Sequence, residues 1–196
     1  MHAAHARFLS IALALALPMA ASADTLFGDL PHSSAEFVVT HLTISNVHGT
    51  IPITSWQATT KAGLIPQSID ATLDARSIDT HDADRDKDLR GADWFEVEKY
   101  PTIEFKSTKV TPAASGTFTA LGNLTLHGVT KTVKLNGQLL GNVVDNRGRT
   151  HVGYTASTTI DRRTFNLTWG QTTPAGQLIV GNDVRIDIQA EGILKK

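Results

Sequence analysis

Residues 117–139 read TFTALGNLTLHGVTKTVKLNGQL and contain two stretches of alternating polarity. In 117–126 every second residue from Phe118 onward is apolar or small, and in 129–139 the apolar residues again share one face. Successive side chains of a β-strand point to opposite faces, so the pattern predicts two strands that are each apolar on one side only. Such half-solvated strands are typical of antiparallel sheets. Gly128 marks the turn between them.

The same alternation recurs along most of the chain. It predicts about eight strands, which span 34–41, 50–60, 68–75, 102–110, 117–126, 129–139, 152–160 and 184–191. Turn-forming residues at 46–49, 63–66, 136–137, 145–148 and 181–183 separate these runs. We therefore predict one all-β domain with an antiparallel sheet that closes into a barrel, because closure removes exposed strand edges. A sandwich of two sheets fits the same pattern.

Several inward positions of the predicted strands carry small residues. They are Ala71, Ala75, Ala120, Gly122, Ala156, Ala190 and Gly192. The interior of an eight-stranded barrel is filled by side chains, or holds one ligand where the side chains leave room. Small inward residues favour the hollow barrel, although they also occur opposite large side chains.

The first 23 residues have the layout of a secretory signal peptide. Arg7 precedes an apolar run over 8–17, Pro18 ends the run, and Ala21-Ser22-Ala23 supplies small residues before Asp24. The apolar run is too short to span a bilayer of roughly 30 Å as a helix. We expect residues 24–196 to form the mature domain, in the bacterial periplasm.

The composition excludes some functions. Eighteen Lys and Arg against 19 Asp and Glu give a formal net charge of −1, without the basic cluster that nucleic-acid binding needs. The absence of cysteine excludes disulfides and thiolate metal sites.

The segment 80–98 departs from strand character and predicts a short helix. Its alternating aspartates resemble a calcium loop, but Lys87 stands where such a loop needs glycine. Read as a helix, the spacing pairs Asp86 with Arg90 and Asp84 with Lys87. Thr80 or Asp82 is the expected N-cap. We expect Trp94 and Phe95 to place this segment across one end of the barrel.

Motifs distributed over nearly all of the predicted mature chain resemble the YceI-like family of polyisoprenoid-binding proteins. They are 32–37 (HSSAEF), 41–42 (HL), 77–80 (SIDT), 85–90 (RDKDLR), 93–95 (DWF), 99–107 (KYPTIEFKS), 122–131 (GNLTLHGVTK), 162–167 (RRTFNL) and 180–184 (VGNDV). The resemblance implies a lipocalin-like antiparallel barrel that holds a long isoprenoid chain in its interior. Two positions depart from the family pattern, which usually has His in place of Asp88 and Gly in place of Asn166.

The apolar face of the predicted strands supplies candidate ligand-binding residues. These are Phe37, Val39, Leu73, Phe105, Phe118, Leu126, Val133 and Tyr154, with Trp94 and Phe95 from the helical segment. Arg85, Arg90 and Arg162 are candidates for contacting a pyrophosphate head group. Ion pairs with Asp86, Asp93 and Asp161 are the alternative role for these arginines.

The sequence offers no recognisable catalytic set and no metal-ligand spacing. Its histidines lack both the H-x₃-H and H-E-x-x-H patterns. We therefore predict a binding protein without cofactor that holds a polyprenyl phosphate or a prenyl quinone for carriage or storage, with the membrane only as the source of the ligand. A homodimer is compatible with the sequence. The alternatives are an enzyme acting on such a lipid through His41, His127 or Glu104, and a stress-response interaction module with a packed barrel.

Overall fold

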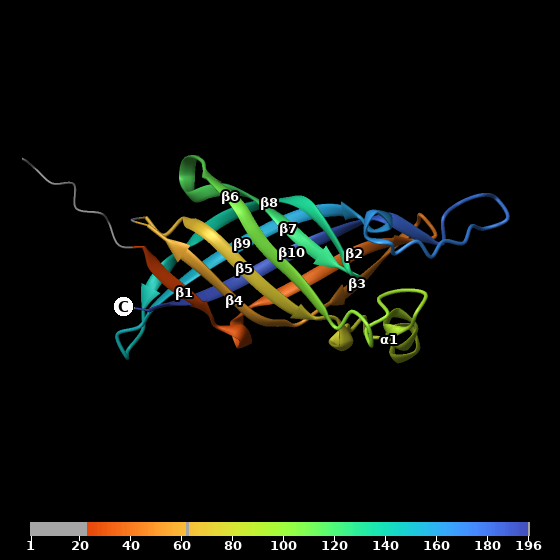
Figure 1. Ribbon diagram of the computed structural model, residues 1–196, viewed down its shortest axis with the longest axis horizontal. Coiled ribbons are helices and arrows are strands. Elements are labelled where there is room, and N and C mark those ends of the chain that lie inside the picture. The colour runs from red at the N-terminus through yellow and green to blue at the C-terminus, as the bar shows by residue number, and fades with distance from the viewer. Residues whose placement is uncertain (1–22, 62, 196) are drawn as a thin grey trace, which may run out of the picture.

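Figure 1 shows the computed structural model, which describes residues 23–61 and 63–195. Within these residues, ten strands form one antiparallel sheet in the order β1-β4-β5-β6-β7-β8-β9-β10-β2-β3, and pairing of β1 with β10 closes eight of them into a barrel. The strands are β1 (Asp24–Gly28), β2 (Ser34–His41), β3 (Ser45–Thr50), β4 (Ile53–Thr60), β5 (Pro66–Asp74), β6 (Thr102–Pro112), β7 (Thr117–Leu126), β8 (Val129–Val144), β9 (Thr150–Asp161) and β10 (Val180–Lys195). The helical elements are α1 (Ala83–Arg90) and the short 3₁₀ turns η1 (Leu30–His32), η2 (Ala75–Ser77), η3 (Ala114–Gly116) and η4 (Arg162–Phe165).

Strand β10 forms the seam of the barrel. One edge pairs with β9, and the other pairs with β2 at Val180 to Gln189 and with β1 at Gly192 to Lys195. Strand β1 continues the wall to β4, while a bridge between Thr50 and Asp79 joins the β2–β3 hairpin to the segment after β5. The predicted closed barrel is confirmed, and the sandwich alternative is wrong.

Two strands were not expected from the sequence. Strand β1 lies at the predicted start of the mature chain, and β3 includes residues 46–49, which the sequence predicts as a turn. Residues 136–137 are a second wrong turn prediction, because Asn136-Gly137 lies within β8 and pairs with both β7 and β9. Residues 181–183 also lie inside a strand, at the register shift of β10 between Val180 and Val184.

Aromatic rings on neighbouring strands explain why glycine occurs at several positions inside the strands. The ring of Phe118 lies over Gly137, its direct partner across the β7–β8 pair, and the ring of Phe105 lies over Gly122. The ring of Trp56 likewise contacts Gly28 and Gly192. Because glycine has no side chain, the neighbouring ring can lie flat on the sheet, and the ring then covers the exposed backbone. Gly122 and Gly192 therefore make room for aromatic rings rather than for a ligand.

We predict that Gly122→Ala destabilises the barrel by about 2 kcal/mol, because a Cβ atom overpacks this site. The added atom would overlap the Phe105 ring and lie 2.7 Å from the carbonyl oxygen of Lys106. Gly153→Ala is the matched control, because its Cβ would lie 3.7 Å from Leu140, an ordinary contact. Urea denaturation measures both variants. Equal midpoints for the two would contradict the packing role of Gly122.

Helix α1 lies at one end of the barrel, called here the α1 end, and the C-terminal end of β10 lies at the other (Figure 1). Asp82 is the N-cap and accepts a hydrogen bond from the Arg85 amide at 3.1 Å. The expected pair of Asp86 with Arg90 is wrong. Asp86 is buried and accepts hydrogen bonds from the amide and hydroxyl of Thr80, at 2.8 and 2.6 Å. None of the helices in the described part of the chain has the length and hydropathy of a membrane span.

Candidate functional site: an apolar cavity inside the barrel

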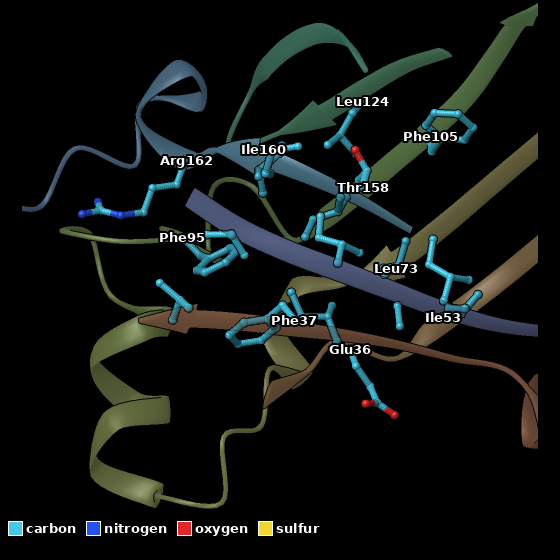
Figure 2. Close-up of a pocket in the computed structure, with 18 of the residues that line it drawn as sticks. Glu36, Phe37, Ile53, Leu73, Phe95, Phe105, Leu124, Thr158, Ile160 and Arg162 are labelled. Atoms are coloured by element: carbon cyan, nitrogen blue, oxygen red, sulfur yellow. The ribbon is translucent and has the colours of Figure 1, made fainter. Parts of the chain in front are cut away.

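The interior of the barrel holds a cavity of about 630 Å³ whose wall is almost entirely apolar. Figure 2 shows apolar side chains from several strands directed into one space, among them Ile53, Leu73 and Phe105, while Glu36 is directed away from it. Ala71, Ala156 and Ala190 also line the cavity, so these small residues do leave space. This volume lies within the roughly 300–1,000 Å³ that is typical of ligand pockets.

The structure brings together the side chains that the sequence predicts as the wall. Phe37, Val39, Leu73, Phe105, Phe118, Leu126, Val133 and Tyr154 all line the cavity, as do Trp94 and Phe95. Arg85 and Arg162 line it as well. Arg90 points elsewhere, and its guanidinium donates to the carbonyl of Ile78 at 3.4 Å. Ligand contact by the lining residues stays a prediction.

Three aromatic side chains form the floor of the cavity, on the side away from α1. Tyr154 makes edge-to-face contacts with Trp56 and Phe118, with ring centroids 6.5 and 6.3 Å apart. The Tyr154 hydroxyl donates to the carbonyl of Leu64 at 2.6 Å, and the Trp56 indole donates to Ser33 Oγ at 3.1 Å. Because both polar groups are satisfied, the floor presents only apolar surface to the cavity.

Beyond this floor, buried core side chains fill the interior of the barrel. Leu26 and Val152 are fully buried there. The cavity is therefore a space with one filled end, and it extends toward α1.

Burial raises the pKa of the Tyr154 phenol. A raised pKa means that folding favours the neutral form, so this contribution to stability is complete below the ordinary value of about 10 and is lost as pH rises beyond it. We predict that an alkaline titration followed by tyrosinate absorbance contains a step at higher pH than an ordinary tyrosine gives. Tyr154→Phe should remove that step, and Tyr100→Phe should retain it. A late step that survives Tyr154→Phe would contradict the assignment.

Side chains from α1 and from two loops form the rim of the cavity. Trp94 stacks on Trp169 with ring centroids 4.9 Å apart, and both residues line the cavity together with Leu89. Three aspartates of the α1 segment, Asp82, Asp84 and Asp88, lie along the same lining. Sequence reasoning missed Trp169, because it lies in a loop where no periodicity marks an inward position. It also missed Trp56, although this residue is in phase with the apolar face of its strand.

Arg162 is only 3% exposed, and its hydrogen bonds hold together segments of the chain that follow β9. Its guanidinium donates to the carbonyls of Gly181 and Leu167 at 2.8 and 2.5 Å, to that of Val180 at 3.2 Å, and to Asn182 Oδ1 at 3.3 Å. It also lies 5.5 Å from the centroid of the Trp94 ring. Burial lowers the pKa of Arg162. The expected ion pair with Asp161 is wrong, because Asp161 pairs with Arg163 at 2.6 Å.

Arg85 lies at the rim in a more open position. Its Nε donates to Thr80 Oγ1 at 2.7 Å and its Nη2 donates to the Thr80 carbonyl at 2.8 Å. Nη1 lies 3.9 Å from Asp82, and the side chain is 40% exposed. Its expected pairing with an acidic neighbour thus involves Asp82, rather than Asp86 or Asp93.

Asn166 has left-handed backbone angles, φ 62° and ψ 15°, at the end of η4. Glycine adopts this conformation without strain, and asparagine is among the few other residues that tolerate it. The departure from the family pattern at this position therefore preserves the local turn.

The three residues of the enzyme hypothesis lie apart. His41 lines the cavity, whereas Glu104 is exposed on the outer face of β6. His127 lies in the β7–β8 turn, where its Nδ1 is 3.2 Å from the carbonyl of Phe165 and its Nε2 is 3.7 Å from Glu96. This placement gives His41 and Glu104 no shared surface for acid–base chemistry.

The closed antiparallel sheet and its apolar interior place this protein among the β-barrels that contain a cavity of ligand size. Residues 29–192 match the YceI-like domain, and the chain belongs to this family. A UPF0312 protein of Vibrio cholerae is 32% identical over 162 residues, which are 81% of this chain and 86% of the relative.

Solved structures of other proteins share the fold. Burkholderia cenocepacia BcnA superposes with a TM-score of 0.72 at 23% identity, over 84% of this chain and 98% of that one. A polyisoprenoid binding domain from Saccharophagus degradans superposes with a TM-score of 0.60 at 16% identity, over 89% of this chain and all of that one.

Proposed function

We propose that this protein binds an isoprenoid lipid, a prenyl quinone or a polyprenyl phosphate, and holds it for carriage or storage without chemical change. The observation that carries the proposal is the cavity of about 630 Å³ with an apolar wall and an aromatic floor. The name of the related barrel from Saccharophagus degradans, a polyisoprenoid binding domain, supports the same ligand class. A packed barrel is disfavoured by the size of the cavity.

Apolar burial alone is sufficient for useful affinity. About ten buried methylene groups contribute about 8 kcal/mol. This free energy corresponds to a dissociation constant near 1 µM, before the cost of ordering the chain is subtracted. The aromatic floor and the aliphatic wall would hold the tail through contacts of this kind.

The distribution of polar groups suggests an orientation for the ligand. The floor offers the cavity no polar contact, whereas the rim carries Arg85 and the aspartates of the α1 segment. We therefore place the tail against Tyr154 and the head group near Arg85. Arg162 would contribute its positive charge beneath the rim, since most of its donors hold backbone carbonyls.

The predicted signal peptide supports a periplasmic location for the mature domain, in which the membrane serves as the source of ligand. Residues 1–22 lie outside the described residues, so the support is the sequence pattern alone.

Native mass spectrometry of the purified protein, followed by organic extraction, tests the proposal. We expect an apolar ligand to be recovered, or a prenyl quinone to be taken up on titration with a stoichiometry of one. Failure of both would refute lipid binding. Recovery of a chemically altered lipid after incubation would instead favour the enzyme alternative.

A further inference from the structure

A cluster of three metal-ligating side chains lies at the seam of the barrel, apart from the cavity. Asp29 follows β1, His151 is in β9 and Glu191 is in β10. One donor atom from each residue lies within 4.8 Å of the other two, and all three residues are half-buried. These residues are far apart in the sequence, and the pairing of β10 with β1 and β9 brings them together.

The orientation of the histidine favours ligation through Nδ1. Its Nε2 lies 3.2 Å from Asp145 Oδ2, while Nδ1 faces Glu191 Oε1 at 2.7 Å. Asp145 is held by the amides of Arg147 and Arg149, both at 2.9 Å, and by the Arg149 guanidinium at 2.7 Å. A carboxylate that orients the far nitrogen of a histidine is the usual support of a metal-bound imidazole.

A half-buried hydroxyl, that of Ser33, fixes the two carboxylate residues relative to each other. Ser33 Oγ donates to the carbonyl of Asp29 at 2.8 Å and accepts from the amide of Glu191 at 3.1 Å. It also accepts from the Trp56 indole, so its one donor and two acceptor sites are used. The amide of Asp29 in turn donates to the Glu191 carbonyl at 2.7 Å. The backbone of Asp29 and Glu191 is therefore preorganised, and it is linked to the floor of the cavity through Trp56.

The charges of the cluster also favour a cation. Both imidazole nitrogens of His151 face carboxylates, Nδ1 that of Glu191 at 2.7 Å and Nε2 that of Asp145 at 3.2 Å. The carboxylates of Asp29, Asp145 and Glu191 around His151 attract a divalent ion, which binds Nδ1 once the proton on that nitrogen is released. Two basic side chains contact carboxylates of this region: Arg149 pairs with Asp145 at 2.7 Å, and His32 Nδ1 lies 3.2 Å from Asp29.

We infer that Asp29, His151 and Glu191 form a binding site for a borderline divalent cation of the Zn²⁺ class. One imidazole nitrogen and two carboxylate oxygens suit such ions, and water would complete the coordination. Ligand bonds of about 2.0–2.2 Å in tetrahedral geometry require the present 2.7 Å between Nδ1 and Oε1 to open to roughly 3.3–3.6 Å. The bound ion would join β1, β9 and β10 at the point where the barrel closes.

Calorimetric titration of the full chain, untagged and freed of metal by chelation, with Zn²⁺ at neutral pH tests this site. We expect one ion per chain, and a melting temperature raised by about 5 °C or more when free Zn²⁺ exceeds the dissociation constant a hundredfold. His151→Gln and Glu191→Gln should abolish this binding. Asp145→Asn should weaken it by roughly 10- to 100-fold, because Asp145 only orients the imidazole.

Two further variants separate ligation from a simple ion pair. Asp29→Asn leaves the contact between His151 and Glu191 intact but removes a ligand, so it should also abolish Zn²⁺ binding. His81→Gln changes an exposed histidine beside Asp79, at 3.7 Å, and should bind Zn²⁺ as the unmodified protein does. Circular dichroism of the metal-free variants checks their fold. Zn²⁺ binding that is absent, or equal in the unmodified protein and in Asp29→Asn, would overturn the inference.

Discussion

Replacing Ala156 with phenylalanine is expected to weaken the binding of a prenyl quinone by at least about tenfold, since losing only two buried methylene contacts costs about 1.6 kcal/mol. Ala156 lies on β9 and its side chain lines the cavity, where the added ring would take space that we assign to the tail. Fluorescence titration of delipidated protein with a prenyl quinone measures the effect.

Gln189→Phe is the matched control for this variant. It adds the same ring to the neighbouring strand β10, at an exposed position. The two variants should have similar stability, because the ring at 156 enters existing space instead of a packed core. If Ala156→Phe folds and binds the quinone as tightly as Gln189→Phe does, the tail does not occupy this cavity.

Arg162→Met is expected to lower the free energy of unfolding by about 3 kcal/mol, because it leaves buried acceptors without donors. The affected acceptors are the carbonyls of Gly181, Leu167 and Val180, together with Asn182 Oδ1. For a chain of this length the loss corresponds to a fall in melting temperature of roughly 6–12 °C. Thermal and urea denaturation measure it.

Arg163→Met provides the comparison on the adjacent residue. The Arg163 side chain is 55% exposed and pairs with Asp161, so its removal should change stability by about 1 kcal/mol or less. Equal losses from the two substitutions would show that the hydrogen bonds of Arg162 contribute no more than a surface ion pair. A normal stability of Arg162→Met with reduced quinone binding would instead assign Arg162 to the ligand.

The strand pattern was predictable because it is a local property of the chain. Alternation in 117–126 and 129–139 places Phe118, Leu126 and Val133 on one face, and the observed pairing of β7 with β8 follows that phase. The wall of the cavity was therefore predictable too, since inward residues of a closed barrel necessarily face its interior. The helix over α1 was predictable from the loss of alternation.

The errors arose at residues whose environment is set by side-chain contacts that the alternation of polarity does not reveal. Gly137 resembles a turn residue, but it lies in a strand because the Phe118 ring covers it. Asp86 resembles a surface helix residue, but Thr80 binds it within the core. Trp169 lies in a loop, and only the packing of its ring against Trp94 brings it to the cavity rim.

By itself, the sequence of this protein determined antiparallel β-strands with one apolar face each, because side-chain alternation needs only neighbouring residues. The tertiary structure decided how the barrel closes at β10, which end of the cavity is filled, and that Arg162 is bound to backbone carbonyls. It also brought Asp29, His151 and Glu191 together. These features depend on the register between distant segments, which is set by packing and closure of the whole sheet and leaves no periodic signal in any one segment.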